Sequence, residues 1–60
     1  MPLIEIDITA GRLAADQKQQ LVIAVTDAIA ASAPVRREEI IISIRETPPG
    51  NRAVAGRIIA

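Results

Sequence analysis

The stretch Leu3-Ile4-Glu5-Ile6-Asp7-Ile8 alternates between apolar and mostly polar positions. Isoleucine occupies every second position, at Ile4, Ile6 and Ile8, and two carboxylates stand between them. A period of two with β-branched side chains is typical of a β-strand that buries one face. We therefore predict a strand over residues 3–8 with its isoleucines directed inward.

A second stretch with the same alternation covers residues 40–44 and can extend to Glu46. It sets Ile40, Ile42 and Ile44 on one face, and the other face carries Ile41, Ser43 and Arg45. Pro48-Pro49-Gly50-Asn51 cannot continue a strand and predicts a turn. The short apolar tail over residues 54–60 then predicts either a small hairpin or a segment that lies on a neighbouring subunit.

The segment between the two strands predicts a helix that ends at Ala33, because a residue before proline avoids the α region. Asp16 and Gln19 stand three apart, as in a capping box, near its start. One apolar helical face follows the spacing of three and four residues. Its members are Leu21, Ala24, Val25, Ala28, Ile29 and Ser32.

Strand, helix and strand in this order predict an α/β (α+β) fold, a single β-α-β domain over residues 1–60 with parallel strands and a right-handed crossover. Two strands and one helix cannot cover both faces of a sheet, whereas parallel sheets are normally buried on both sides. A chain of 60 residues without cysteine also lacks disulfides as a source of stability. We therefore expect the uncovered face to meet other copies of the chain.

The composition excludes several classes of function. Seven basic and seven acidic side chains give a net charge of zero, and aromatic residues are absent, so nothing favours nucleic-acid binding. Without cysteine there is no cysteine-ligated metal site. The apolar runs are too short to span a membrane, and the start lacks the basic region of a signal peptide. We expect a soluble, cytoplasmic protein.

Pro2 follows the initiator methionine, and a side chain this small does not obstruct removal of Met1. The mature chain would then begin with the secondary amine of proline. Because the sequence has neither histidine nor cysteine, this amine is the group best suited to titrate near neutral pH. Burial beside a cation would lower its pKa, and a base with a pKa near the working pH is efficient in proton transfer.

Four short motifs resemble the 4-oxalocrotonate tautomerase family: Met1-Pro2 at the start, Gly11-Arg12 after the first strand, Asp16-Gln17-Lys18 at the helix start, and Pro48-Pro49-Gly50-Asn51. The resemblance implies that Pro2 is a general base that moves a proton between oxygen and carbon of an enol or dienol carboxylic acid. It implies that Arg12 binds a substrate carboxylate. It also implies assembly as a homohexamer, or as a trimer of two-chain heterodimers, without cofactor or metal.

Two positions depart from the family pattern. The second substrate-binding arginine of the family falls on Ile41, and Arg45 lies four residues further on, displaced by roughly 13 Å along a strand. The residue after Asn51, usually aromatic, is Arg52. We take Arg52 as a candidate for the missing substrate contact, with Arg45 and Arg57 as weaker candidates.

A second resemblance, to the β chain of trans-3-chloroacrylic acid dehalogenase, is carried by Lys18-Gln19-Gln20-Leu21 and Gly56-Arg57-Ile58. In that relative the β chain supplies the proline, and its partner supplies the arginines and a water-activating carboxylate. The present sequence has no acidic residue after Glu46, so a hydratase or dehalogenase would need a second kind of subunit. A non-catalytic assembly subunit and a small binding protein are the remaining alternatives.

Overall fold

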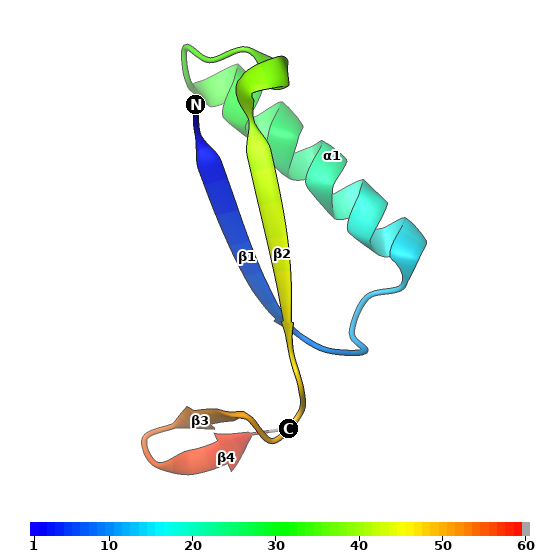
Figure 1. Cartoon of the computed structure of the whole chain (residues 1–60), viewed down its shortest axis with the longest axis vertical. Coiled ribbons are helices and arrows are strands. Elements are labelled where there is room, and N and C mark those ends of the chain that lie inside the picture. The colour runs from blue at the N-terminus through cyan, green and yellow to red at the C-terminus, as the bar shows by residue number, and fades with distance from the viewer. Residues whose placement is uncertain (60) are drawn as a thin grey trace.

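The computed structural model describes residues 1–59, and Ala60 lies outside the described part. Two parallel strands and a connecting helix form one unit, and a small hairpin follows it (Figure 1). This is the predicted β-α-β fold with a C-terminal hairpin. The elements in chain order are β1 (Leu3–Thr9), α1 (Ala15–Ser32), the 3-10 helix η1 (Arg37–Glu39), β2 (Ile41–Thr47), β3 (Arg52–Val54) and β4 (Arg57–Ile59).

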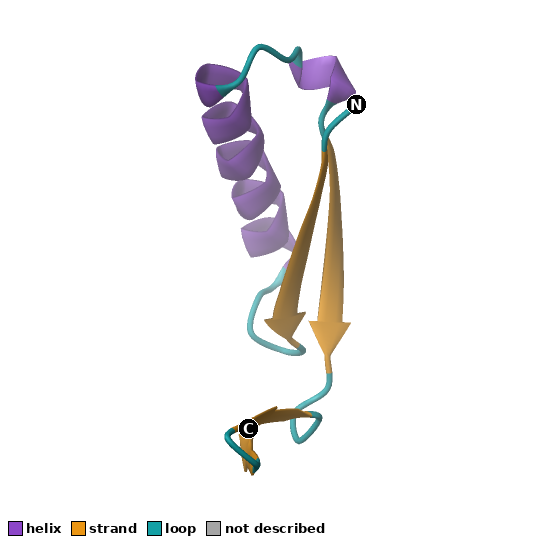
Figure 2. Ribbon diagram, turned by 90° about the vertical axis from the view of Figure 1, so that its left-hand side faces the viewer, coloured by secondary structure: helices purple, strands orange, loops and turns teal. Residues whose placement is uncertain are grey.

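The parallel register of β1 and β2 runs from Leu3 opposite Ile41 to Thr9 opposite Thr47. The helix α1 lies along one face of this sheet, as Figure 2 shows. The isoleucines of that face are half-buried, as the alternation predicts. The other face is uncovered, and we call it the open face. Its members are Leu3, Glu5, Asp7, Ile41, Ser43 and Arg45, all exposed.

The helix begins earlier than the predicted capping pair requires. Ala14 is the N-cap residue, and its backbone N–H donates to Gln17 Oε1 at 2.8 Å. The prediction of a cap formed by Asp16 and Gln19 is therefore wrong, because both residues already lie inside the helix. The predicted end is confirmed, since Ala33 is extended at φ −128° and ψ 152°.

The helical face turned toward the sheet is rotated from the predicted one. Leu21, Val25 and Ile29 are half-buried as expected, but Ala24, Ala28 and Ser32 are exposed. Their places are taken by Val22, Thr26 and Ala30. The branched side chain of Val22 removes more apolar surface from water than an alanine does, so packing favours the stripe that contains it. Lys18 continues this stripe and forms a 3.0 Å ion pair with Glu46 on β2.

The C-terminal hairpin turns through two residues with positive φ, Ala55 at 50° and Gly56 at 81°. This is the pattern of a type I′ turn, which matches the twist of a two-residue hairpin. The hairpin projects beyond the end of β2 and pairs only within itself (Figure 1). Val54 and Ile58 are 62% and 68% exposed, so its apolar side chains stand in solvent when the chain is alone.

No side chain within residues 1–59 is fully buried in the single chain. The accessible surface is 4540 Å², whereas a compact monomer of 6.4 kDa would expose about 3,800 Å². The radius of gyration is 14.1 Å, against about 10.4 Å expected for 60 residues. The isolated chain therefore lacks the interior that would stabilise it. No helix within the described residues is long and apolar enough to cross a membrane.

Candidate active site and open sheet face

Pro2 lies at the start of β1, beside the first residue of β2. Its carbonyl oxygen accepts a hydrogen bond from the Ile41 N–H at 3.0 Å, and Pro2 itself is half-buried. Leu3 and Ile41 are directly paired in the register, so the next row of the sheet is apolar. Met1 is 89% exposed at this edge. Removal of Met1 would leave the proline nitrogen at this end of the sheet, next to the Leu3–Ile41 pair in the chain and register.

Arg12 lies beyond the other end of β1, in the loop that leads to the helix. Its N–H donates to the Thr9 carbonyl at 3.3 Å, and Gly11 between them has a φ of 84°. A turn of this kind requires positive φ at its third position, which glycine adopts without steric cost. Arg12 is exposed, and its guanidinium is available to a partner outside the chain. Gly11 therefore allows the chain to turn between β1 and the segment that leads to α1.

Three polar side chains lie around Asp7 at the end of the sheet nearest Arg12. Its Oδ1 accepts from Thr47 Oγ1 at 2.7 Å and forms an ion pair with Arg52 Nη2. Arg45 stands opposite Asp7 in the strand register. The Thr47 hydroxyl and the Arg52 guanidinium hold the pKa of Asp7 below its ordinary value of 3.8, and the charge of Arg45 acts in the same direction. Arg52 is thus engaged by a carboxylate of its own chain.

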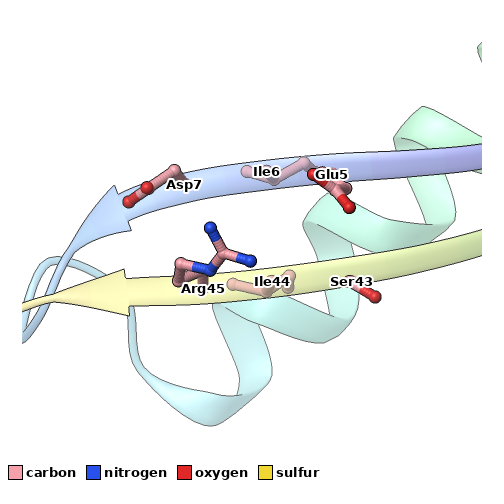
Figure 3. Close-up of a pocket in the computed structure, with 6 residues that line it drawn as sticks. All are labelled: Glu5, Ile6, Asp7, Ser43, Ile44 and Arg45. Atoms are coloured by element: carbon pink, nitrogen blue, oxygen red, sulfur yellow. The ribbon is translucent and has the colours of Figure 1, made fainter.

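A shallow groove of about 460 Å³ lies along the sheet and is lined by three residues of each strand. The lining residues are Glu5, Ile6, Asp7, Ser43, Ile44 and Arg45 (Figure 3). The Arg45 side chain points from β2 toward β1 on the side of the sheet away from α1. Within residues 1–59, no group of three or more His, Cys, Asp or Glu side chains is placed to hold a metal ion.

One chain does not bring the predicted site residues together. Pro2 precedes β1 and Arg12 follows it, so the six steps along the strand alone separate them by roughly 20 Å. Arg45 and Arg52 lie with Asp7 at the Arg12 end, and Arg57 opens β4 in the hairpin. Ile41, in contrast, is beside Pro2, since its N–H donates to the Pro2 carbonyl oxygen.

Sequence reasoning missed Asp7 as a member of this cluster. Its position on the polar side of β1 was evident, and the strand register alone would have placed it opposite Arg45. Its contact with Arg52 joins residues 45 positions apart and depends on the direction in which the hairpin leaves β2.

The fold defines a class of small β-α-β proteins, and in this chain Pro2 directly precedes the first strand. The chain matches the family described as Tautomerase enzyme over residues 2–60, and it belongs to that family. No curated protein matches the chain.

Several solved structures share the fold over nearly the whole chain. A member of the 4-oxalocrotonate tautomerase family is 40% identical, with a TM-score of 0.84, and the match covers 97% of this chain and 89% of that one. A heterohexamer 4-oxalocrotonate tautomerase from Chloroflexus aurantiacus is 34% identical, with a TM-score of 0.88 and coverage of 97% and 92%. One of the isozymes from Methylibium petroleiphilum is 32% identical, with a TM-score of 0.88 and coverage of 95% and 88%.

Proposed function

We propose that the chain is a tautomerase that acts on a small 2-hydroxy-dienoate or enol-keto acid, with the amine of Pro2 as the general base after removal of Met1. The observation that carries the proposal is the family match, which begins at residue 2 and so includes the proline. The aliphatic surroundings of Pro2 support it as well. A neighbouring chain that covers this apolar edge would disfavour the charged ammonium form and leave the nitrogen free to accept a proton.

The reaction needs one base and one anion-binding group. The Pro2 nitrogen takes the proton of the substrate hydroxyl, and the O–H electrons form the carbonyl as the double bonds shift. The distal carbon then takes the proton back from the Pro2 ammonium. Arg12 binds the substrate carboxylate through two parallel N–H···O bonds, which fixes the acid in one orientation.

The proposed site is built from more than one chain. Because Pro2 and Arg12 flank β1 at opposite ends, a neighbouring copy with its β1 reversed would bring its Arg12 end to the Pro2 end of the first chain. The relative from Chloroflexus aurantiacus is a heterohexamer, and we propose that this chain also self-associates. Among the remaining arginines, Arg45 and Arg57 are exposed, whereas Arg52 would have to exchange Asp7 for a substrate carboxylate.

Replacement of Pro2 by alanine tests the identity of the base. We expect the rate of enol-to-keto conversion, followed by ultraviolet absorbance with a 2-hydroxy-dienoate, to fall by about 100-fold or more. Pro34→Ala is the matched control, because Pro34 is exposed and lies outside the proposed site. Intact mass of each protein reports whether Met1 has been removed. Equal rates for wild type and Pro2→Ala would exclude Pro2 as the base.

One observation favours a second candidate, a proline-bearing subunit of a heterohexameric hydratase or dehalogenase. The residue beside Pro2 on β2 is Ile41, so this chain places no cation there. A partner chain with an arginine at that position would complete the site. If the purified chain forms no stable oligomer and gains activity only with a second, similar chain, this candidate replaces the homo-oligomer.

A further inference from the structure

We propose that Asp7 is a positioning residue that sets the charge of the preferred substrate, because it holds Arg52 away from a second substrate carboxylate. The inference rests on the function proposed above and adds a substrate class to it, acids with one carboxylate rather than two. In that function Arg12 binds the first carboxylate. A second carboxylate would need another guanidinium at that end of the sheet, where Arg45 and Arg52 both face Asp7.

The carboxylate of Asp7 engages Arg52 and is itself held in place. Its Oδ1 forms the ion pair with Arg52 Nη2 and also accepts from Thr47 Oγ1 at 2.7 Å. Arg45 lies opposite Asp7 in the strand register, and its side chain points toward β1 (Figure 3). The Thr47 hydroxyl and the Arg52 guanidinium lower the pKa of Asp7, so this carboxylate stays ionised at neutral pH. One negative charge therefore faces two guanidinium groups.

This cluster lies close to the proposed carboxylate-binding arginine. The Arg12 N–H donates to the Thr9 carbonyl oxygen at 3.3 Å. Thr9 follows Asp7 by two residues on β1, a distance of about 7 Å along the strand. A small diacid bound to Arg12 at one end would bring its other carboxylate into this neighbourhood. There it would meet the like charge of Asp7, and Arg52 would have to release Asp7 to bind it.

The Pro2 end of the sheet also favours an uncharged substrate end. Leu3 and Ile41, which are paired in the register beside Pro2, are 57% and 44% exposed. The two arginines just before β2 each form an ion pair with a carboxylate of the chain. A carboxylate that loses its water without a partner is costly, whereas a hydrocarbon end suits an aliphatic surface. Both ends of the sheet therefore favour an acid with one carboxylate.

The Asp7–Arg52 pair is weak enough to exchange partners. The Arg52 and Asp7 side chains are 32% and 44% exposed, and solvent screens an ion pair of this kind. A substrate carboxylate can therefore displace Asp7, but it gains little because one ion pair replaces another. We expect a discrimination of about fivefold against the second carboxylate rather than complete exclusion.

Asp7→Asn in the full-length, assembled protein tests this role, because it removes the charge and keeps the size of the side chain. Enol-to-keto conversion is measured with a 2-hydroxy-dienoate that carries one carboxylate and with its counterpart that carries a second at the far end. We expect the KM of the diacid to fall by about fivefold, with kcat and the KM of the monoacid within about twofold of wild type. Asp7→Glu, which retains the charge, should keep the wild-type preference.

Two further variants separate release of Arg52 from a general change of charge. Glu46→Gln removes a negative charge from the same end of the sheet, where Glu46 pairs with Lys18 rather than with an arginine. It should leave the KM of the diacid within about twofold of wild type. The double variant Asp7→Asn/Arg52→Gln should lose the gain, because the released guanidinium is then absent. An equal gain in Glu46→Gln, a gain that persists in the double variant, or no gain in Asp7→Asn would overturn the proposal.

Binding of two unreactive acids tests the charge preference without turnover and without any substitution. Hexanoate has one carboxylate and hexanedioate has two, and NMR chemical-shift titration of the wild type measures the affinity of each. We expect hexanoate to bind at least as tightly as hexanedioate. Tighter binding of hexanedioate would overturn the proposal, even if Asp7→Asn failed to fold. Equal turnover by wild type and Pro2→Ala would instead refute the proposed base, and the same titration would still decide the charge preference.

Discussion

Asp7 joins three segments of the chain: β1 through its own backbone, the end of β2 through Thr47, and the hairpin through Arg52. Its depressed pKa makes this junction dependent on pH. A carboxyl whose pKa is lower in the folded state stabilises that state above its unfolded pKa of about 3.9. That contribution is lost as pH falls through the folded-state pKa. The hairpin should therefore loosen from the sheet only in strongly acidic solution.

Titration of Asp7 by carbon-13 NMR of its carboxyl group measures this effect. We expect a midpoint below 3.8 in the wild type. Thr47→Val should move the midpoint upward by removing the hydroxyl donor, and Arg52→Gln should move it upward by removing the guanidinium donor and its charge. A midpoint unchanged by both substitutions would mean that the contacts of Asp7 do not persist in solution.

Residue-level prediction succeeded where a contact follows from strand register. The spacing of Ile41 and Arg45 on one face was predictable, because alternation fixes which side chains share a face. The pairing of Arg52 with Asp7 was not, since it depends on the path of the Pro48-Pro49-Gly50-Asn51 turn. The separation of Pro2 from Arg12 could have been predicted from the length of β1, but the sequence analysis did not include it.

At the scale of the elements, the hairpin contains one residue with a strained backbone. Ala55 adopts a φ of 50°, where its Cβ crowds the backbone by about 1–2 kcal/mol. Ala55→Asn or Ala55→Gly should relieve part of this strain and stabilise the protein by about 1 kcal/mol. The midpoint of thermal unfolding, measured at fixed chain concentration, should rise by about 4–8 °C. Gly56→Ala, at a φ of 81°, should act in the opposite direction.

The helix illustrates how far an apolar pattern determines an element. Its existence and its end before Pro34 follow from local chemistry and were predicted. Its rotation about its own axis did not follow, because Ala24 and Ala28 have the same spacing as Val22 and Thr26 and are equally compatible with a helical face. Contact with the isoleucines of the sheet selects the bulkier stripe, and that contact is not a property of the helical sequence alone.

At the scale of the whole molecule, stability should depend on chain concentration. No side chain of residues 1–59 is fully buried in the single chain, so most of the stabilising burial must arise between chains. Anything that binds the folded form raises its stability by mass action, and here the ligand is another chain. Each tenfold dilution should disfavour the assembled state by about 1.4 kcal/mol for each chain that joins it. Calorimetry over a hundredfold range of concentration should show a steadily falling unfolding temperature on dilution. A constant value would contradict this expectation.

The absence of an interior in the single chain also changes how substitutions in this protein are to be interpreted. In most proteins an exposed apolar side chain such as Ile58 tolerates replacement, and intolerance marks the inside. Here no side chain of residues 1–59 is fully buried in one chain, and we expect a full interior to form only where chains meet. A change at Ile58 or Leu3 would be inherited by every copy at once and repeated around the assembly. Because symmetry repeats a substitution in every subunit, its effect on stability is repeated as well. The positions that look most permissive in one chain are therefore expected to be among the most constrained.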